Sequence, residues 1–146
     1  MQFYRPEYFK PHELVPPEVW EKYKHKGDDF IWMFFRPELL FSLDWIRKIH
    51  GPRTCNNYIW GGQREESGLR LHTSTGASMS QHKLGAASDS VGSTPAEEIR
   101  QAIIDNPWFV GYQYITCLEV GPDINWLHFD VRNWDKKAHG ILLVER

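Results

Sequence analysis

The clearest element in the hydrophobic pattern lies between Pro37 and Gly51. Apolar residues recur there every three or four positions, a spacing that places them on one face of an α-helix. These residues are Leu39, Leu40, Leu43, Ile46 and Ile49. Proline is favoured at the first helical position and glycine just past the last, so we predict an amphipathic helix over residues 37–50, with its apolar face on the core.

A second helix is predicted between Thr94 and Pro107. Thr94 and Glu97 have the spacing of a capping box, and Pro95 would occupy the first helical position. The dipeptide Asn106-Pro107 would end the helix. The apolar positions expected to face the core are Ile99, Ile103 and Ile104.

Residues 1–36 are rich in proline, aromatic and charged residues. They contain one probable helix start, Pro17, again a proline suited to the first helical position. We expect this region to form a wrap that packs on the rest of a single domain, residues 1–146. No internal repeat or low-complexity linker divides the chain.

Three segments in the last third of the chain are typical of β-strands. They are residues 111–120, 126–134 and 141–145, with a turn signal at Gly121-Pro122-Asp123 between the first two. Residues 52–81, in contrast, form a long stretch rich in glycine, serine and threonine, and loops of this length are usually functional or disordered. The predicted fold class is therefore α+β, with an antiparallel sheet and flanking helices.

The middle strand, residues 126–134, has two faces of different chemistry. Its apolar face carries Leu127, Phe129 and Val131, and its other face carries Trp126, His128, Asp130 and Arg132. A solvated face would more often show lysine, threonine or glutamate than tryptophan and histidine. We therefore expect the second face to line a cleft, the alternative being an ordinary polar surface.

Composition narrows the range of partners. The chain has 146 residues, is 41% hydrophobic and carries a formal net charge of −2. No long run of like charge is present, so neither nucleic acid nor an anionic membrane is an expected partner. The apolar stretches are too short to span a bilayer, and the N-terminus lacks the layout of a signal peptide. We expect a soluble monomer in which Cys55 and Cys117 are small buried hydrophobes.

The segment SQHKLGAASD places His82 and Asp89 on either side of Gly85. Their separation is wrong for two ligands on one helix face, but a turn at Gly85 could bring both side chains to one point. Alone, such a pair has little meaning. Together with His128 it provides two imidazoles and one carboxylate, and three such ligands with a position left for water are the composition of a catalytic zinc site.

These two segments resemble the motifs of the zinc D-alanyl-D-alanine carboxypeptidases and their phage endolysin relatives, which cleave peptidoglycan stem peptides. The two matching motifs are Ser80-Gln81-His82-x-x-Gly85-x-Ala87-x-Asp89 and, later in the chain, residues 126–132. Three further segments agree with the family: YFKPHEL near the start, LLFSLDWIRKIHG, and SGLR at residues 67–70. The resemblance covers most of the chain. It implies the fold that these enzymes share with the hedgehog signalling domain.

Carried over position by position, the resemblance makes His82, Asp89 and His128 the zinc ligands. It makes Arg70 the group that pairs with the terminal carboxylate of the substrate, a task suited to a guanidinium; the alternative is an ordinary surface arginine. Ser80, which opens the first motif, and Trp126, on the cleft face, are further candidates for substrate contact.

The catalytic base is less clearly marked. Many members of the family have an acid three residues before the last histidine ligand, and Asn125 occupies that position here. Three acids are left as candidates: Glu119 on the preceding strand, Asp123 in the turn, and Asp130 beside His128. We rank Glu119 first, because a strand position is more rigid than a turn and because Asp130 could instead orient the histidine through its other ring nitrogen.

The function predicted is zinc-dependent hydrolysis of peptidoglycan stem peptides by a D,D-carboxypeptidase or endopeptidase. The alternative is an inactive zinc-binding module of the same fold, such as a virion component. We expect a protein made in the cytoplasm that acts at the cell wall or periplasm or is carried in a phage particle. Of the five other histidines, His50 would carry a positive charge favoured at a helix end, and the rest are expected at the surface.

Overall fold

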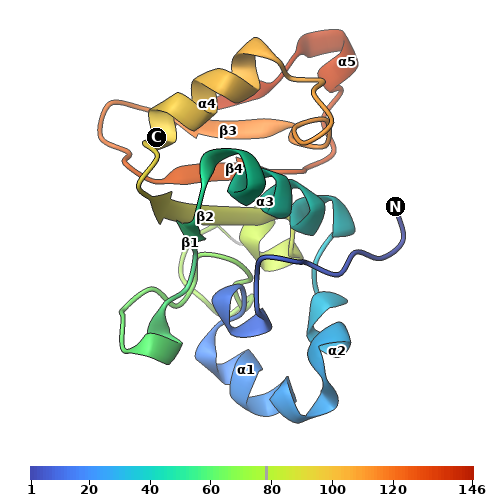
Figure 1. Cartoon of the computed structure of the whole chain (residues 1–146), viewed down its shortest axis with the longest axis vertical. Helices are drawn as coiled ribbons and strands as arrows, with labels where there is room; N and C mark the ends of the chain where they lie inside the picture. Colours follow the sequence, from blue (N-terminus) through green and yellow to red (C-terminus); the bar gives the residue numbers. More distant parts are fainter. Residues whose placement is uncertain (78) are drawn as a thin grey trace.

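The computed structural model describes residues 1–77 and 79–146, which form one α+β domain (Figure 1). The helices are α1 (Pro17–Tyr23), α2 (Asp28–Trp32), α3 (Pro37–His50), α4 (Ala96–Asp105) and α5 (Lys136–His139). The strands are β1 (Arg53–Thr54), β2 (Ala87–Gly92), β3 (Cys117–Val120), β4 (Leu127–Asp130) and β5 (Leu142–Glu145). Short 3-10 helices include η3 (Tyr58–Trp60) and η4 (Gln81–Leu84).

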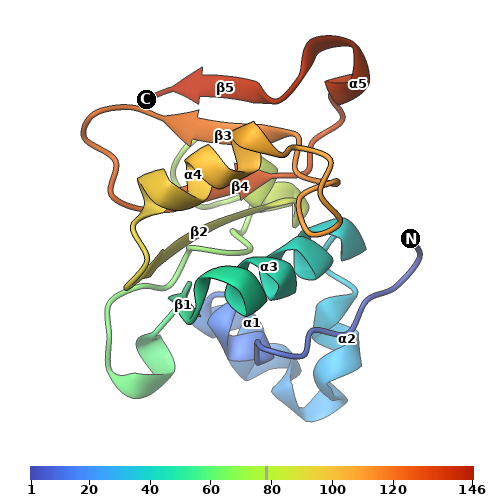
Figure 2. The same cartoon turned by 45° about the horizontal axis from the view of Figure 1, so that its top comes forward.

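The five strands form one sheet in the order β1-β2-β4-β3-β5. The pairs β1–β2, β2–β4 and β3–β4 are antiparallel, but β3 and β5 are parallel, so the prediction of an antiparallel sheet is wrong in this detail. The reason is the connection through α5. It carries the chain from the end of β4 past β3 to the free edge of the sheet, where β5 runs in the direction of β3 (Figure 2).

The two predicted helices are present, and only α4 differs from the prediction at its start. Helix α3 has the predicted bounds, and its apolar residues are buried except Ile49, which lies exposed in the last turn. Helix α4 begins at Ala96, and no capping box forms. The Thr94 hydroxyl instead donates a hydrogen bond to the His50 carbonyl (2.6 Å). Ile99 and Ile103 face the core, whereas Ile104 is exposed.

The strand prediction for residues 111–120 is too long. Successive turns, in which the amides of Phe109, Tyr112 and Ile115 donate to carbonyls three residues earlier, occupy most of the chain between α4 and β3. Tyr112 and Ile115 are buried there without joining the sheet. Strand β2 was not predicted, because its sequence ASDSVG has few residues with strand preference.

The sheet has one face that helices cover and an opposite face, called the open face below, on which His128 and Asp130 are nevertheless buried. Helices α3 and α4 cover the same face (Figures 1 and 2), and the predicted apolar face of β4, residues Leu127, Phe129 and Val131, is buried as expected. The region 1–36 contains α1 and α2 and contributes Leu14, Val15 and Ile31 to the same core. Within the described part of the chain, no helix is long and apolar enough to cross a membrane.

Candidate metal centre

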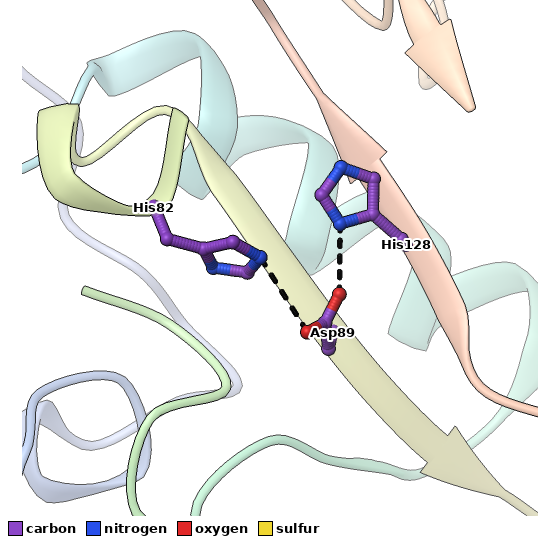
Figure 3. A group of neighbouring side chains, drawn as sticks. All are labelled: His82, Asp89 and His128. Atoms are coloured by element: carbon purple, nitrogen blue, oxygen red, sulfur yellow. Dashed lines mark hydrogen bonds and ion pairs between the residues drawn. The ribbon is translucent and has the colours of Figure 1, made fainter. Parts of the chain in front are cut away.

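His82, Asp89 and His128 meet on the open face of the sheet (Figure 3). One ligand atom from each lies within 4.8 Å of the others. His82 Nε2 is 3.4 Å from Asp89 Oδ2, and His128 Nδ1 is 2.8 Å from Asp89 Oδ1. The structure thus brings together the three residues that the sequence predicts as ligands, in a group that could hold a metal ion.

Each ligand is positioned by local chain geometry. Asp89 and His128 are directly opposite on the antiparallel strands β2 and β4, so their side chains share a face. His82 belongs to η4, which begins with the Ser80 hydroxyl accepting from the His82 amide (3.3 Å). It ends at Gly85, whose φ of 65° is left-handed and where a Cβ would overlap the carbonyl oxygen of Phe34. The predicted turn at Gly85 is confirmed.

The outward nitrogens of both rings face hydrogen-bond acceptors. His82 Nδ1 lies 2.9 Å from the Gly68 carbonyl, and His128 Nε2 lies 3.1 Å from Asp130 Oδ2. A neutral ring therefore keeps its proton on the outside and directs a lone pair toward Asp89. Asp130 is itself held by Arg132, whose Nε donates to Oδ1 over 2.7 Å. Because the donor atoms converge and the rings are oriented in this way, the residues fit a divalent metal ion.

The charges within the site favour a cation at its centre. Burial alone would lower the pKa of His128, but hydrogen bonds to Asp130 and Asp89 raise it to about 9. Burial would raise the pKa of Asp89, but hydrogen bonds from His128 and His82 bring it well below its usual range. Without a metal ion, the place between His128 and Asp89 is therefore occupied by a proton.

We expect metal binding to be coupled to release of this proton. Coordination through His128 Nδ1 requires the lone pair, so at neutral pH about one proton should leave for each ion bound. The apparent affinity should rise as the pH increases toward 9 and level off above it, because the ring is then already neutral. Calorimetric titration with zinc chloride in buffers of different ionisation enthalpy measures this release. An affinity independent of pH between 6.5 and 9 would contradict it.

Glu119 and Arg70 border the cluster. Glu119 Oε1 is 3.1 Å from His128 Nδ1, as expected if the adjacent strands place Glu119 opposite His128. The other carboxylate oxygen of Glu119, Oε2, is 3.0 Å from Arg146 Nη1. Arg70 donates from Nη2 to Asp89 Oδ2 (3.2 Å) and from Nε to the Glu66 carbonyl (2.8 Å). Glu119, Arg70 and Ser80 line a cleft of about 400 Å³ that opens beside the two histidines.

Other predicted residues lie farther from the cluster. Asp130 is fully buried on the outer side of the His128 ring, where it orients the ring. Asp123 and Asn125 are exposed on the connection before β4. The Arg146 guanidinium carbon lies 5.5 Å from the centroid of the Trp126 ring. Arg146, rather than Trp126, lines the cleft. Arg146 was not singled out from the sequence, since only the parallel pairing of β5 with β3 brings the last residue to this cleft.

Two of the remaining histidines are less exposed than predicted. His50 Nε2 lies 2.8 Å from the Tyr112 hydroxyl, and burial lowers the pKa of His50, which disfavours the expected helix-end cation. His12 is half-buried between Trp20 and Trp60, and burial lowers its pKa too. The cysteines are both free and buried, as predicted.

Comparison of the chain with protein-family models, with curated proteins and with solved structures finds no match. The structure itself defines a small α+β domain with a five-stranded mixed sheet. On the open face of that sheet lies a candidate metal centre of two histidines and one aspartate.

Proposed function

We propose that this protein is a zinc-dependent peptidoglycan peptidase with the hedgehog/D,D-peptidase type of fold. The observation that carries the proposal is the His82–Asp89–His128 group, oriented from outside by Gly68 and Asp130 and open to a cleft on one side. Zinc prefers nitrogen and carboxylate ligands of this kind; bound by three protein groups, it polarises a carbonyl and lowers the pKa of water. The motif resemblance supplies the substrate class.

Glu119 is the proposed general base. Its carboxylate lies at the edge of the ligand group, on a strand, with its side chain only 12% exposed. It can accept a proton from the attacking water and deliver it to the leaving amine. Asp130 is unsuited to this step because Arg132 and His128 occupy it, so we assign it the positioning of the His128 ring.

Arg70 is proposed to bind the terminal carboxylate of the stem peptide. Its Nε and Nη2 already hold the Glu66 carbonyl and Asp89, which fixes the guanidinium beside the ligand group. Its Nη1 makes no hydrogen bond within the described residues and is available to a substrate carboxylate. Ser80, at the rim of the same cleft, is a further proposed contact.

Metal analysis combined with hydrolysis of purified peptidoglycan tests the proposal. We expect about one zinc ion for each chain and release of amino acid or peptide from the stem, lost with a chelator and restored by zinc. A synthetic pentapeptide should be cleaved faster than the same peptide with an amidated C-terminus if Arg70 binds the carboxylate. Tight zinc binding with no cleavage of any stem peptide would refute the enzymatic activity.

An inactive zinc-binding module is the second candidate. It is favoured by Asn125 in the position where the family has an acid, and by the ion pair that engages Glu119 with Arg146. Such a module would bind zinc through the same three residues and act in a phage particle or at the cell wall without turnover. The Glu119 variant described in the Discussion distinguishes the two.

A further inference from the structure

A second cavity, of about 600 Å³, lies at the end of the sheet away from β1. It is bordered by the start of α3, the turns after α4 and the segment that leads from β4 into α5. Its size is that of a site for a small molecule or a short polymer segment. Two tryptophans in its lining, Trp108 and Trp134, are 57% and 37% exposed, although large aromatic side chains are normally buried.

Both indole rings are held in place. Trp134 donates from Nε1 to the Gly140 carbonyl (2.8 Å). Trp108 lies over the Lys136 ammonium, 4.5 Å from the ring centroid. Lys136 is buried and donates to the carbonyls of Pro107, Tyr112 and Gln113 at 2.6–3.1 Å, so its three protons are all used within the protein. Lys136 therefore fixes the turn that presents Trp108 and is not itself free to bind a ligand.

The rest of the lining is rich in polar side chains that can bind hydroxyl and amide groups. Gln113 donates from Nε2 to the Val110 carbonyl, which leaves its Oε1 as an acceptor. Asn133 and Asp135 are exposed at the same cavity. A sugar ring has apolar C–H faces that stack on an indole and hydroxyl groups at its edge that need such partners. Exposed indoles beside polar side chains of this kind fit a saccharide better than a wholly apolar ligand.

The cavity and the candidate metal centre share one lining residue, Arg132. Its guanidinium is neutralised by Asp130. One extended ligand could therefore occupy both sites, with one part at the indoles and another at the histidines. A peptide attached to a glycan strand has this shape.

We propose that the Trp108–Trp134 cavity binds a glycan strand of β-1,4-linked N-acetylhexosamine units. The choice of sugar rests on the proposed peptidoglycan substrate, but the binding itself requires neither metal nor turnover. The site would hold the polysaccharide while the stem peptide reaches the metal centre. This gives the single domain its own contact with the cell wall.

Calorimetric titration with the β-1,4-linked N-acetylglucosamine tetramer tests the proposal. We expect measurable binding by the wild-type protein and about tenfold weaker binding, or none, by Trp108→Ala. Trp60→Ala is the matched control, because Trp60 is 66% exposed on η3, outside the cavity, and its loss should leave the affinity unchanged. Trp108 is widely exposed and lies outside the hydrophobic core, so the test variant should fold, and circular dichroism of both variants checks this.

A His82→Ala variant separates this inference from the proposed peptidase activity. It should bind the tetramer as the wild-type protein does, even where hydrolysis is absent. The inference is overturned if the wild-type protein does not bind the tetramer at millimolar concentration, or if Trp108→Ala binds it equally well. It is also overturned if an acidic peptide displaces the tetramer and binds more tightly, which would identify the cavity as a peptide site.

Discussion

A Glu119→Gln variant is expected to hydrolyse stem peptides about a hundred to ten thousand times more slowly than the wild-type protein, with its zinc content unchanged. The amide keeps the size and most of the polarity of the side chain but cannot take a proton from water. The three ligands are untouched, and Glu119 itself lies at the edge of the ligand group. The measurements are kcat on a synthetic pentapeptide and metal content by atomic spectroscopy.

The matched control is Asp123→Asn, the same chemical change at the acid in the turn. Asp123 is exposed and its substitution should leave kcat within about twofold of wild type. The Glu119→Gln variant also loses the ion pair between Glu119 and Arg146. This loss should have little effect on folding, because the Arg146 side chain is 61% exposed and such pairs contribute little to stability. If Glu119→Gln retains full activity, Glu119 is not the base. If the wild-type protein binds zinc but has no activity to lose, the inactive module is the correct alternative.

The site combines three acids with three arginines. Asp89 contacts Arg70, Asp130 contacts Arg132, and Glu119 contacts Arg146. The pairs balance in charge, so two neutral imidazoles and a bound divalent ion would leave the site with net positive charge. That charge favours a substrate with a free carboxylate and a reaction in which negative charge develops on a carbonyl oxygen.

Several features were predictable because they depend on local periodicity. The spacing of apolar residues together with Pro37 and Gly51 predicts α3 to the residue, and alternation along β4 separates the apolar face from the polar face that carries His128. The placement of Glu119 near His128 follows from the pairing of neighbouring strands. The convergence of His82 and Asp89 depends on the left-handed conformation of Gly85, which glycine adopts without steric cost and which the glycine in the sequence therefore indicates.

Other features depend on contacts between distant segments. Strand β2 has weak strand preference and exists because β1 and β4 pair with it on both sides. The Gly68 carbonyl reaches His82 because the loop containing it is held by backbone bonds to Leu14 and His82. The burial of His12 and His50 likewise depends on Trp60 and Tyr112, which are far away in sequence. No periodic pattern in the chain encodes these partners.

A His82→Ala variant is expected to lose zinc by more than about a hundredfold in affinity, and hydrolysis with it. Zinc sites with four ligands bind with roughly 10–16 kcal/mol, so each ligand accounts for about 3 kcal/mol. Without His82, only Asp89 and His128 remain, and two ligands do not enclose the ion. Competition with a chromophoric chelator measures the affinity. His25→Ala, an exposed histidine on the N-terminal region, is the control and should bind zinc as wild type does.

Thermal unfolding separates loss of the metal site from loss of the fold. Zinc at a hundredfold excess over its Kd should stabilise the wild-type protein by about 2.7 kcal/mol, which raises Tm by several degrees. Metal-free His82→Ala loses the ring packing, the bond to the Gly68 carbonyl and the contact with Asp89, but no part of the hydrophobic core, so it should still unfold cooperatively. Zinc should leave its Tm nearly unchanged. An equal rise of Tm in both proteins would mean that zinc binds elsewhere, because mass action stabilises a protein only through the site that the ion occupies.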